Sequence, residues 1–456
     1  MTASSIVKAY DIRGTVPDEL NSHVCELIAR AVCILLRQEG ESAIVVGHDM
    51  RESSPELVSA FTKTLVEFGI NVIELGLVST DALYFASGYF ELPGAMFTAS
   101  HNPSNYNGLK LCRKNAVPIG QDSGLDLIKN YLLHPHDIDR PTSRGTVTQE
   151  QILNIYADFF ASKFSVNSVQ PLSVVVDAGN AMAGLTFPIV ASRFNFDTHD
   201  LYFELDGRFP HHEPNPIDAQ NLKDLQAKVL EVNADIGLAF DGDADRCFIV
   251  DENANIVSPS VITALISQEV LRQHPGAAIV YNVISSRVVP ETITRMGGIA
   301  IKSRVGHSFI KQLMAKHEAE FGGEHSGHFY FKDFWYADSG MFAALYVLQL
   351  LAQTSLPLSK LIEPYQEWTE SGEINVKVAD AHSTLLSIKR HAKKVSDIEI
   401  DETDGLTLES ADWRVNIRMS NTEPLLRLNA LARSQEEVAR LVDEYLHLIN
   451  EVQLQL

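Results

Sequence analysis

The segment Thr98–Pro103 combines residue types that could carry out covalent chemistry: Thr-Ala-Ser-His-Asn-Pro. Ser100 places a hydroxyl in a turn-forming sequence, because Ser, Asn and Pro all favour turns. His101 is its direct neighbour, a poor placement for a nucleophile and its base, and no Gly-x-Ser-x-Gly elbow surrounds Ser100. A serine that accepts a phosphoryl group needs cations and a metal ion more than a histidine. Lys110 could supply that charge or, with a lowered pKa, act as a base, the alternative being an ordinary turn and a solvated lysine.

Three carboxylates at alternate positions, Asp241, Asp243 and Asp245, form a second candidate site. They resemble the start of an EF-hand loop, with Glu252 at loop position twelve, but Arg246 occupies position six, where a sharp turn requires glycine. The flanking apolar runs also indicate strands and not helices. Oxygen ligands on a loop between strands leave positions open for a substrate phosphate, which suits Mg²⁺ better than Ca²⁺. Arg246 could hold that phosphate against the metal, and a solvated acidic turn is the alternative.

A third candidate site lies near the C-terminus. Polar and apolar residues alternate along 413–418, which places the polar set on one face of a strand: Arg414, Asn416 and Arg418. The turn that follows has hydroxyls and backbone N–H groups that can cradle an anion: Ser420, Asn421 and Thr422. Arg427 adds a second guanidinium, and arginine offers the bidentate geometry that phosphate oxygens prefer. A charged strand face beside a polar turn is the alternative.

The run Gly322–His328 joins flexible glycines to groups that can bind sugar hydroxyls, among them Glu324 and Ser326. A zinc site is disfavoured, because the run lacks the spacing of a helical His-Glu-x-x-His motif.

Composition limits the partners of this chain. It has 456 residues, enough for several domains with their own cores, and a net charge of −22 from 37 basic and 59 acidic residues. Such a field repels nucleic acid and anionic membranes, so an anionic substrate needs a locally cationic pocket. We find no 18-residue apolar run and no apolar N-terminal signal segment. The four cysteines lack metal or disulfide-framework spacing, which favours a reducing cytoplasm.

The elements that must position these residues follow an α/β pattern. Ala43–Val46 is predicted to be a buried strand, and Ser54 and Pro55 then open a helix as N-cap and first helical residue. Gly69 ends the helical spacing, and Ile70–Leu75 is a second strand. A β-α-β unit implies a parallel sheet.

The same pattern recurs later in the chain, with strands predicted at 173–176, 278–283 and 299–302. The C-terminal strands instead alternate polar and apolar residues, as half-exposed antiparallel strands do, and Ser434 and Glu437 form a capping box for a final helix. We therefore predict three successive α/β mixed-sheet domains and a smaller C-terminal α+β domain. The predicted boundaries are 1–145, 146–255, 256–368 and 369–456.

Together these motifs resemble the α-D-phosphohexomutases of the bacterial phosphomannomutase/phosphoglucomutase kind, over the whole length and in the same order. Five segments carry the resemblance: 8–14 as the opening motif, 98–103 as the phosphoserine loop, 241–246 as the metal loop, 323–328 as the sugar-specificity loop and 418–424 as the phosphate loop. It implies four domains around a central cleft. It also implies a resting enzyme phosphorylated on Ser100, which joins the three aspartates on Mg²⁺, and a hexose 1,6-bisphosphate that acts as intermediate and activator.

The resemblance implies a role for each further residue. Catalytic groups beside Ser100 would be Lys110, His101, Arg13 and His328, the last assisting proton transfer. The substrate-binding set would be Tyr10, Arg246, His307, Glu324, Ser326, Arg418, Ser420, Asn421, Thr422 and Arg427.

Two positions depart from the family pattern. His325 stands where many dual-specificity members have methionine, and Ile284 falls where relatives often place a lysine, so Arg287 is the expected replacement. We expect interconversion of mannose 6-phosphate and mannose 1-phosphate by a monomer or homodimer. Phosphoglucomutase or phosphoglucosamine mutase activity is the alternative within the class, and a metal-dependent sugar phosphatase or a non-catalytic sugar-phosphate sensor lies outside it.

Overall fold

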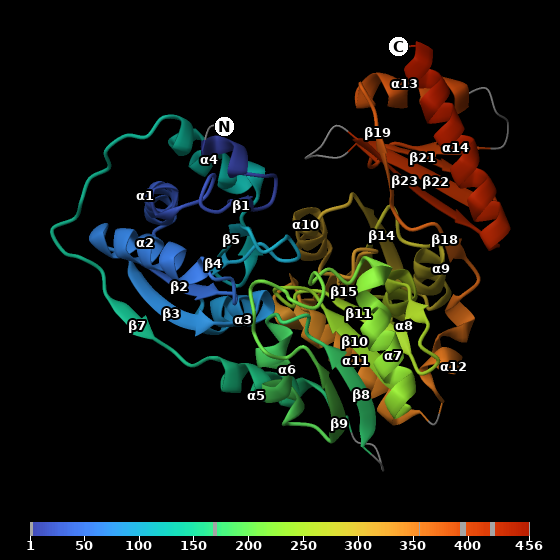
Figure 1. The fold of residues 1–456 in the computed structure, drawn as a ribbon, viewed down its shortest axis with the longest axis horizontal. Coiled ribbons are helices and arrows are strands. Elements are labelled where there is room, and N and C mark those ends of the chain that lie inside the picture. The colour runs from blue at the N-terminus through green and yellow to red at the C-terminus, as the bar shows by residue number, and fades with distance from the viewer. Residues whose placement is uncertain (1–2, 167–170, 355, 393–397, 420–424, 456) are drawn as a thin grey trace. The chain divides into compact units, whose positions relative to one another are not determined.

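The computed structural model describes residues 3–166, 171–354, 356–392, 398–419 and 425–455 (Figure 1). It divides into two compact units. The first unit comprises residues 1–259 and 326–361, and the second comprises residues 260–325 and 362–456.

The first sheet carries the serine segment. Its strands run in the order β1-β5-β4-β2-β3-β7, with β6 beside β5. Their bounds are Ile12–Thr15 (β1), Ala43–His48 (β2), Asn71–Leu77 (β3), Gly94–Phe97 (β4), Tyr106–Arg113 (β5), Val117–Pro118 (β6) and Val147–Gln149 (β7). The helices are Ser22–Gln38 (α1), Ser54–Glu67 (α2), Thr80–Phe90 (α3) and Leu125–Leu133 (α4). β2 pairs in parallel with β3, which confirms the predicted β-α-β unit, whereas β5 runs antiparallel to β4 and β1.

The start of α2 differs from the prediction. Ser53, not Ser54, is the N-cap, and Ser54 is the first helical residue. The Ser54 hydroxyl donates to Asp49 Oδ1 at 2.9 Å and accepts from the Asn107 amide at 3.0 Å. A tertiary contact thus takes the side chain that local capping rules assigned to the helix end.

The second sheet carries the carboxylate segment. Its order is β12-β11-β10-β8-β9, with bounds Leu172–Asp177 (β8), Phe196–Leu201 (β9), Ile236–Phe240 (β10), Cys247–Asp251 (β11) and Ile256–Val257 (β12). The accompanying helices are Leu153–Lys163 (α5), Ala183–Ala191 (α6) and Lys223–Val232 (α7). β8 and β10 are parallel, and β10 and β11 form an antiparallel hairpin. Both hairpin strands are buried throughout, so the turn between them is held rigidly.

In the second unit, β13 (Ala278–Asn282) pairs in parallel with β14 (Ile299–Ser303) and β15 (Phe321–Gly323). The accompanying helices are Pro259–Gln273 (α8), Val288–Arg295 (α9) and His307–His317 (α10). The segment 329–361 returns to the first unit with the antiparallel pair β16 (Phe329–Phe331) and β17 (Ala337–Asp338) and with helix α11 (Gly340–Gln353). Helix α12 (Leu358–Ile362) follows.

The C-terminal sheet is antiparallel, as predicted, in the order β18-β23-β22-β21-β20 with β19 beside β23. Its strands are Thr369–Glu370 (β18), Ile374–Lys377 (β19), Glu399–Asp401 (β20), Leu406–Glu409 (β21), Trp413–Met419 (β22) and Leu425–Ala432 (β23). Helices Ala381–Ala392 (α13) and Gln435–Gln455 (α14) accompany it, and the Ser434 hydroxyl accepts from the Glu437 amide as predicted.

The polar face of β22 departs from the expectation of a half-exposed strand. Arg414, Asn416 and Arg418 are all buried. Each has partners that replace water: Arg414 donates to the carbonyl oxygen of Ser285, and Asn416 donates to that of Asp404. Buried polar groups need such partners, so alternation alone did not reveal their burial.

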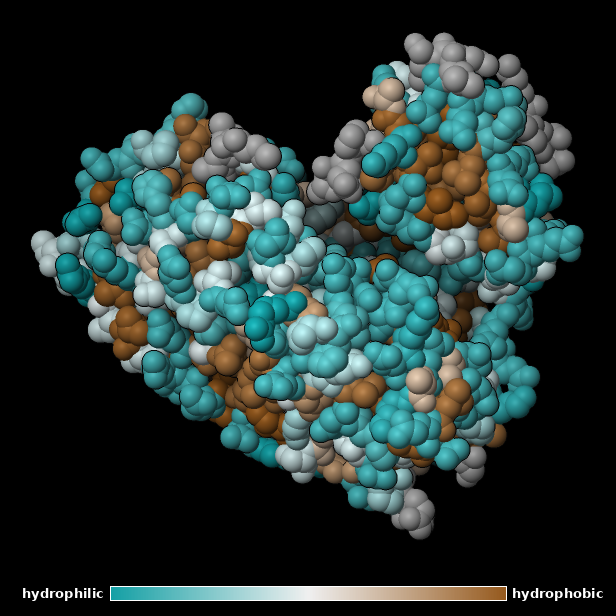
Figure 2. Space-filling view, in the orientation of Figure 1, coloured by the Kyte–Doolittle hydropathy of each residue, from teal (hydrophilic) through white to brown (hydrophobic). Residues whose placement is uncertain are grey.

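The face of the molecule in Figure 2 is mostly hydrophilic. Within the described residues, no single helix has the length and apolar character needed to cross a membrane. Among the same described residues, one pair of helices meets those criteria together, α11 and Leu358–Tyr365, with a bend of 102° between them.

Gly88 in α3 provides a test of the packing in the first unit. A Cβ atom added at Gly88 would lie 2.3 Å from the Trp335 ring. Gly88→Ala is therefore expected to lower the free energy of unfolding by about 1–3 kcal/mol, although alanine favours a helix by about 1 kcal/mol. Denaturant unfolding measures the change. In a double-mutant cycle, Trp335→Leu should make Gly88→Ala nearly neutral, and an equal loss in both backgrounds would contradict the proposed clash.

Candidate active site

Ser100 lies in the loop between β4 and β5 and is only 3% exposed. Its φ of +50° is in the left-handed region, which costs a non-glycine residue about 1 kcal/mol or more. The Ser100 amide donates to Thr98 Oγ1 at 2.9 Å, and its hydroxyl donates to Asp241 Oδ2 at 2.7 Å. The strained turn therefore points the hydroxyl directly at the carboxylate segment.

The three aspartates of the β10–β11 turn converge as the sequence predicts. Asp241, Asp243 and Asp245 are all buried, and one carboxylate oxygen of each lies within 4.8 Å of the others. The Oδ1 atoms of Asp243 and Asp245 accept no hydrogen bond from any residue that the structure describes. Buried carboxylate oxygens without donors are costly, and a hard divalent cation would satisfy them. The donor set therefore fits Mg²⁺.

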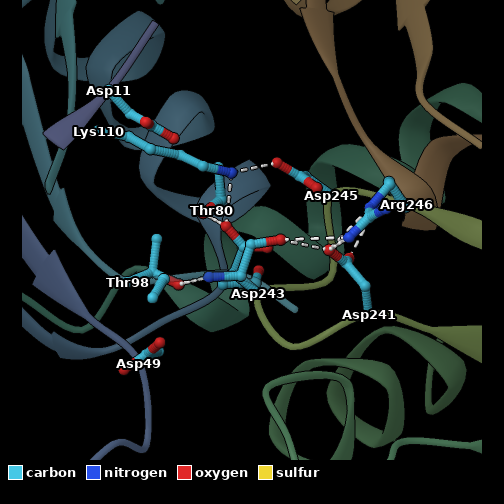
Figure 3. Close-up of polar contacts among 12 residues, drawn as sticks. Asp11, Asp49, Thr80, Thr98, Lys110, Asp241, Asp243, Asp245 and Arg246 are labelled. Atoms are coloured by element: carbon cyan, nitrogen blue, oxygen red, sulfur yellow. Dashed lines mark hydrogen bonds and ion pairs between the residues drawn. The ribbon is translucent and has the colours of Figure 1, made fainter. Parts of the chain in front are cut away.

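Lys110 reaches into this carboxylate cluster from β5, as Figure 3 shows. Its Nζ lies 2.6 Å from Asp243 Oδ2 and 2.5 Å from Asp245 Oδ2. Burial alone would lower the pKa of Lys110, but the two carboxylates outweigh it and raise the pKa above the usual range. This arrangement favours the interpretation of Lys110 as a source of positive charge over that of a base with a lowered pKa. The side chain is a buried cation and not a solvated one.

Burial and the neighbouring charges also give the aspartates of this cluster different pKa values. Burial, only partly offset by Arg246 and reinforced by Asp245, raises the pKa of Asp241 to about 7. Burial would raise the pKa of Asp243 too, but Lys110 holds it well below the usual range. A cluster that cannot ionise freely by itself would be stabilised by a bound cation.

Arg246 and His101 complete the surroundings of the Ser100 hydroxyl. Arg246 Nη2 lies 2.8 Å from Asp241 Oδ2 and 3.4 Å from Ser100 Oγ. His101 Nδ1 lies 3.2 Å from Ser100 Oγ and 2.5 Å from Arg246 Nη2. Burial and the charge of Arg246 keep the pKa of His101 well below its usual value.

Ser100 and His101 are in contact although they are sequence neighbours, but the hydroxyl donates to Asp241 and the ring nitrogen also faces Arg246, so the contact does not make them a nucleophile and its base. The left-handed conformation of Ser100 folds the following side chain back toward the hydroxyl. This geometry was not readable from the sequence.

Arg13 approaches the same loop from β1. Its Nη1 donates to Asn102 Oδ1 at 2.5 Å and to the Ala99 carbonyl oxygen at 3.3 Å, and its Nε donates to Asp11 Oδ2 at 2.8 Å. Tyr10 precedes β1 and is half-buried. The predicted opening motif thus reaches the serine loop through Arg13.

His328 and Ser326 also belong to the first unit. Ser326 Oγ lies 2.8 Å from His328 Nδ1, and His328 Nε2 lies 3.7 Å from Asp245 Oδ1. His328, Asp245 and Asp338 offer ligand atoms within 4.8 Å of one another, beside the first carboxylate group. The structure thus brings the second half of the predicted sugar loop to the carboxylate cluster.

The first half of that loop lies in the second unit. Glu324 is buried, and its Oε1 accepts from the Gly306 amide at 3.1 Å and from the Asn282 amide at 3.5 Å. His307 is the first residue of α10. Glu324 and His307 are therefore presented by neighbouring ends of the β13–β15 sheet and α10.

The predicted phosphate cradle is in the second unit. Arg418 Nη1 donates to Asn429 Oδ1 at 2.7 Å, and its Nη2 pairs with Glu373. Arg427 Nε lies 3.4 Å from Glu373 Oε1, so two guanidinium groups converge on one carboxylate. The other predicted cradle residues lie outside the described residues: Ser420, Asn421 and Thr422.

The structure changes the interpretation of the position around Ile284. Arg287 is already engaged, because it donates to Glu409 Oε1 at 2.6 Å and lies over the Trp368 ring at 4.9 Å. Arg414 instead lines a small, partly open pocket together with Ile284. A different arginine therefore brings positive charge beside Ile284.

His325 lines the same pocket and lies 3.4 Å from Glu370 Oε1. Burial would lower the pKa of His325, but Glu370 outweighs it and raises the pKa. The position that departs from the family pattern is thus tied to strand β18 of the C-terminal sheet.

Two residues that contact the site were missed by the sequence analysis. The Thr80 hydroxyl donates to Asp243 Oδ2 at 2.5 Å, and its amide donates to the Asp243 carbonyl oxygen at 2.9 Å. Arg51 donates to the carbonyl oxygen of Ser100 at 2.8 Å. The Ser-Thr-Asp sequence indicates a helix start at Thr80. Only the fold, however, brings Thr80 to Asp243 and Arg51 to the Ser100 carbonyl.

Comparisons with known proteins agree with this architecture. Four models of the phosphoglucomutase/phosphomannomutase family match: alpha/beta/alpha domain I at residues 4–134, domain II at 154–254, domain III at 258–368 and the C-terminal domain at 373–448. A crystal structure of a phosphoglucomutase/phosphomannomutase family protein from Burkholderia thailandensis has a TM-score of 0.91 and 31% identity, covering 99% of this chain and 98% of that chain.

Two curated relatives extend the comparison. A protein from Xanthomonas campestris pv. campestris named "Phosphohexose mutases" is 39% identical over 430 residues, which cover 93% of this chain and 94% of that protein. An Escherichia coli protein named "Phosphomannomutase" is 38% identical over 446 residues, which cover 95% of this chain and 96% of that protein. With the serine loop, carboxylate turn and α/β sheets in the same chain, these matches show that the protein belongs to the phosphoglucomutase/phosphomannomutase family of phosphohexomutases.

Proposed function

We propose that this chain is a phosphomannomutase that interconverts mannose 6-phosphate and mannose 1-phosphate through a phosphoserine at Ser100. One observation carries the proposal: a buried serine hydroxyl in a strained turn donates to Asp241 and lies 3.4 Å from the Arg246 guanidinium. Those are the surroundings that a phosphoryl carrier requires. The names of the relatives support the choice of mannose phosphates.

The proposed reaction transfers the phosphoryl group twice. In the first step, the bond between phosphorus and Ser100 Oγ breaks, and a bond forms to the free sugar hydroxyl, giving a hexose 1,6-bisphosphate. The proton of that sugar hydroxyl passes to a base, which we propose to be His101 or His328. After the bisphosphate reverses its orientation, the bond between its other phosphorus and the sugar oxygen breaks, and a bond forms from that phosphorus to the Ser100 oxygen left by the first step. The base then gives the proton to the freed sugar oxygen.

The chain's own residues would hold the reacting groups. Mg²⁺ bound by Asp241, Asp243, Asp245 and the phosphorylated Ser100 would neutralise charge that develops on the transferring group. Arg246 would bind the same phosphoryl oxygens, and Lys110 would contribute a permanent positive charge. Arg13 would hold the loop from its other side through Asn102.

Further residues would bind the remainder of the substrate. Glu324 and Ser326, from the two halves of the predicted sugar loop, would accept and donate hydrogen bonds with sugar hydroxyls. His307 and Tyr10 would add further contacts. Arg418 and Arg427 would exchange their carboxylate partner Glu373 for the non-reacting phosphate, with Ser420, Asn421 and Thr422 proposed as the rest of the cradle.

We propose the four domains 1–145, 146–255, 256–368 and 369–456, a monomeric or homodimeric state and a cytoplasmic location. Limited proteolysis, size-exclusion chromatography with light scattering, and cell fractionation test these three points.

An assay of the purified protein tests the function. The protein with Mg²⁺ and a trace of hexose 1,6-bisphosphate should convert mannose 6-phosphate to mannose 1-phosphate. Parallel reactions with glucose and glucosamine 6-phosphates rank the alternatives, and release of inorganic phosphate measures phosphatase activity. Burial of Ser100 favours transfer to a bound sugar over transfer to water, so phosphate release exceeding mutase turnover would contradict the proposal.

Arg418→Ala tests the proposed cradle. The substitution removes a buried, charge-assisted phosphate contact and should cost about 2–4 kcal/mol in kcat/KM. We expect a higher KM, lower turnover in both directions and more bisphosphate released per turnover, measured by coupled assays and by mass spectrometry of free bisphosphate. Arg440→Ala, which breaks only an exposed pair with Glu444 on α14, is the control. Unchanged kinetics in Arg418→Ala would show that this site is not the phosphate cradle.

A further inference from the structure

Arg51 is the most extensively bonded buried cation in the described part of the first unit. It follows β2, and its side chain has 0% exposure. Its guanidinium donates to four backbone carbonyl oxygens of the serine loop: those of Ser100 (2.8 Å), Asn102 (2.6 Å), Pro103 (2.7 Å) and Tyr106 (2.9 Å). One side chain therefore links four backbone positions of the segment between β4 and the start of β5.

The charge of Arg51 is balanced within the same structure. Its Nε donates to Asp49 Oδ2 at 3.2 Å, and Asp49 is itself fully buried. The face of the guanidinium lies over the Phe209 ring, 5.2 Å from its centre, in a segment that follows β9. Each nitrogen of the planar group thus donates to an acceptor, and the Phe209 ring covers its flat face. Lysine cannot reproduce this arrangement.

The serine loop needs such support. Ser100 has a φ of +50°, a strained conformation that a serine keeps only when several contacts from the surrounding structure hold it in place. Carbonyl groups that point inward from a buried turn need donors, since each unpaired one costs free energy. Arg51 supplies those donors to residues on both sides of the hydroxyl that faces Asp241.

We infer that Arg51 is a positioning residue for the phosphoryl-transfer step, holding the loop so that the oxygen of Ser100 stays aligned with the carboxylate turn. The inference rests on the proposed function, in which Ser100 carries the phosphoryl group. Arg51 does not touch the hydroxyl, and it acts through the backbone of residues 100–106. Substrate affinity, which depends on other residues, should not depend on it.

Arg51→Lys tests this role, because an ammonium group retains the charge but cannot direct donors to four carbonyl oxygens. We expect kcat to fall about 100-fold, as for a misplacement of about 1 Å, with KM within about threefold of the wild-type value. The rate at which hexose 1,6-bisphosphate phosphorylates Ser100, followed by intact mass, should fall with kcat. Arg113→Lys on β5 is the matched control, since Arg113 also bonds a carboxylate and a backbone carbonyl in the same domain.

Hydrogen exchange gives a readout that needs no turnover. Amides of residues 98–106 should exchange faster in Arg51→Lys than in wild type, and Arg113→Lys should leave them unchanged. If Arg51→Lys does not fold, Phe209→Leu removes only the ring beneath the guanidinium and should lower kcat by a smaller factor at constant KM.

The outcomes separate this inference from the proposed function. A wild-type protein that neither turns over mannose 6-phosphate nor accepts phosphate on Ser100 would refute the proposed function. An active wild type with unchanged kcat in Arg51→Lys, or in Phe209→Leu if the lysine variant does not fold, would overturn the role of Arg51 alone. A rise in KM that accounts for the whole loss would overturn it as well.

Discussion

Ser100→Ala is expected to reduce mutase turnover by at least about 1,000-fold, a loss of about 4 kcal/mol in transition-state stabilisation. The reason is chemical: alanine has no oxygen to carry the phosphoryl group between the two positions of the sugar. The wild-type protein as purified should carry one phosphate, and peptide mapping should place it on Ser100. The substitution removes one hydroxyl from a buried turn, so the fold should persist.

Ser104→Ala is the matched control, because Ser104 lies in the same loop but is exposed. It should retain both activity and phosphorylation of Ser100. Near-wild-type turnover by Ser100→Ala, or phosphate mapped to another residue of an active protein, would exclude the covalent mechanism.

Asp243→Asn is expected to lower turnover by roughly 1,000-fold while preserving the shape of the side chain. The substitution removes a negative charge from the proposed Mg²⁺ site and places an amide group toward the Lys110 ammonium, which now lies 2.6 Å from Asp243 Oδ2. Calorimetric titration should show weaker Mg²⁺ binding in the variant. This binding measurement separates loss of the metal from other causes of low turnover.

Asp251→Asn provides the control for this prediction. Asp251 is a buried aspartate at the end of β11 that accepts hydrogen bonds from the backbone of its own turn. Its replacement should leave Mg²⁺ binding and turnover close to wild type. Full activity of Asp243→Asn, or of the wild type in excess chelator, would refute the assignment of the metal site.

Local patterns in the sequence were sufficient to predict the helices and strands that bury one or both faces. The β2-α2-β3 unit, the buried hairpin strands around 241–246 and the antiparallel C-terminal sheet all follow from the period of their apolar residues. The carboxylate spacing likewise indicated three converging oxygens, because a short turn between paired strands leaves its side chains little choice of direction. Such features depend on neighbours within a few residues.

The sequence was not sufficient where a side chain finds its partner far along the chain. Lys110 was interpreted as a source of positive charge or as a base with a lowered pKa, and two aspartates more than a hundred residues away favour the first by raising its pKa. The polar face of β22 was expected to meet water, yet Arg414 bonds the Ser285 backbone. In both cases the deciding interaction is electrostatic and non-local.

The sequence by itself therefore determined the order of the α/β domains, the serine and carboxylate segments and, through five motifs in one order, the family of this protein. The tertiary structure alone decided which charges meet: Lys110 with Asp243, Arg246 with His101, and Arg51 with the carbonyl groups of the serine loop. The physical reason is range. Hydrophobic periodicity and turn preferences act between residues close in sequence, whereas the pKa of a buried group and the satisfaction of a buried carbonyl depend on whichever residues the completed fold places around them.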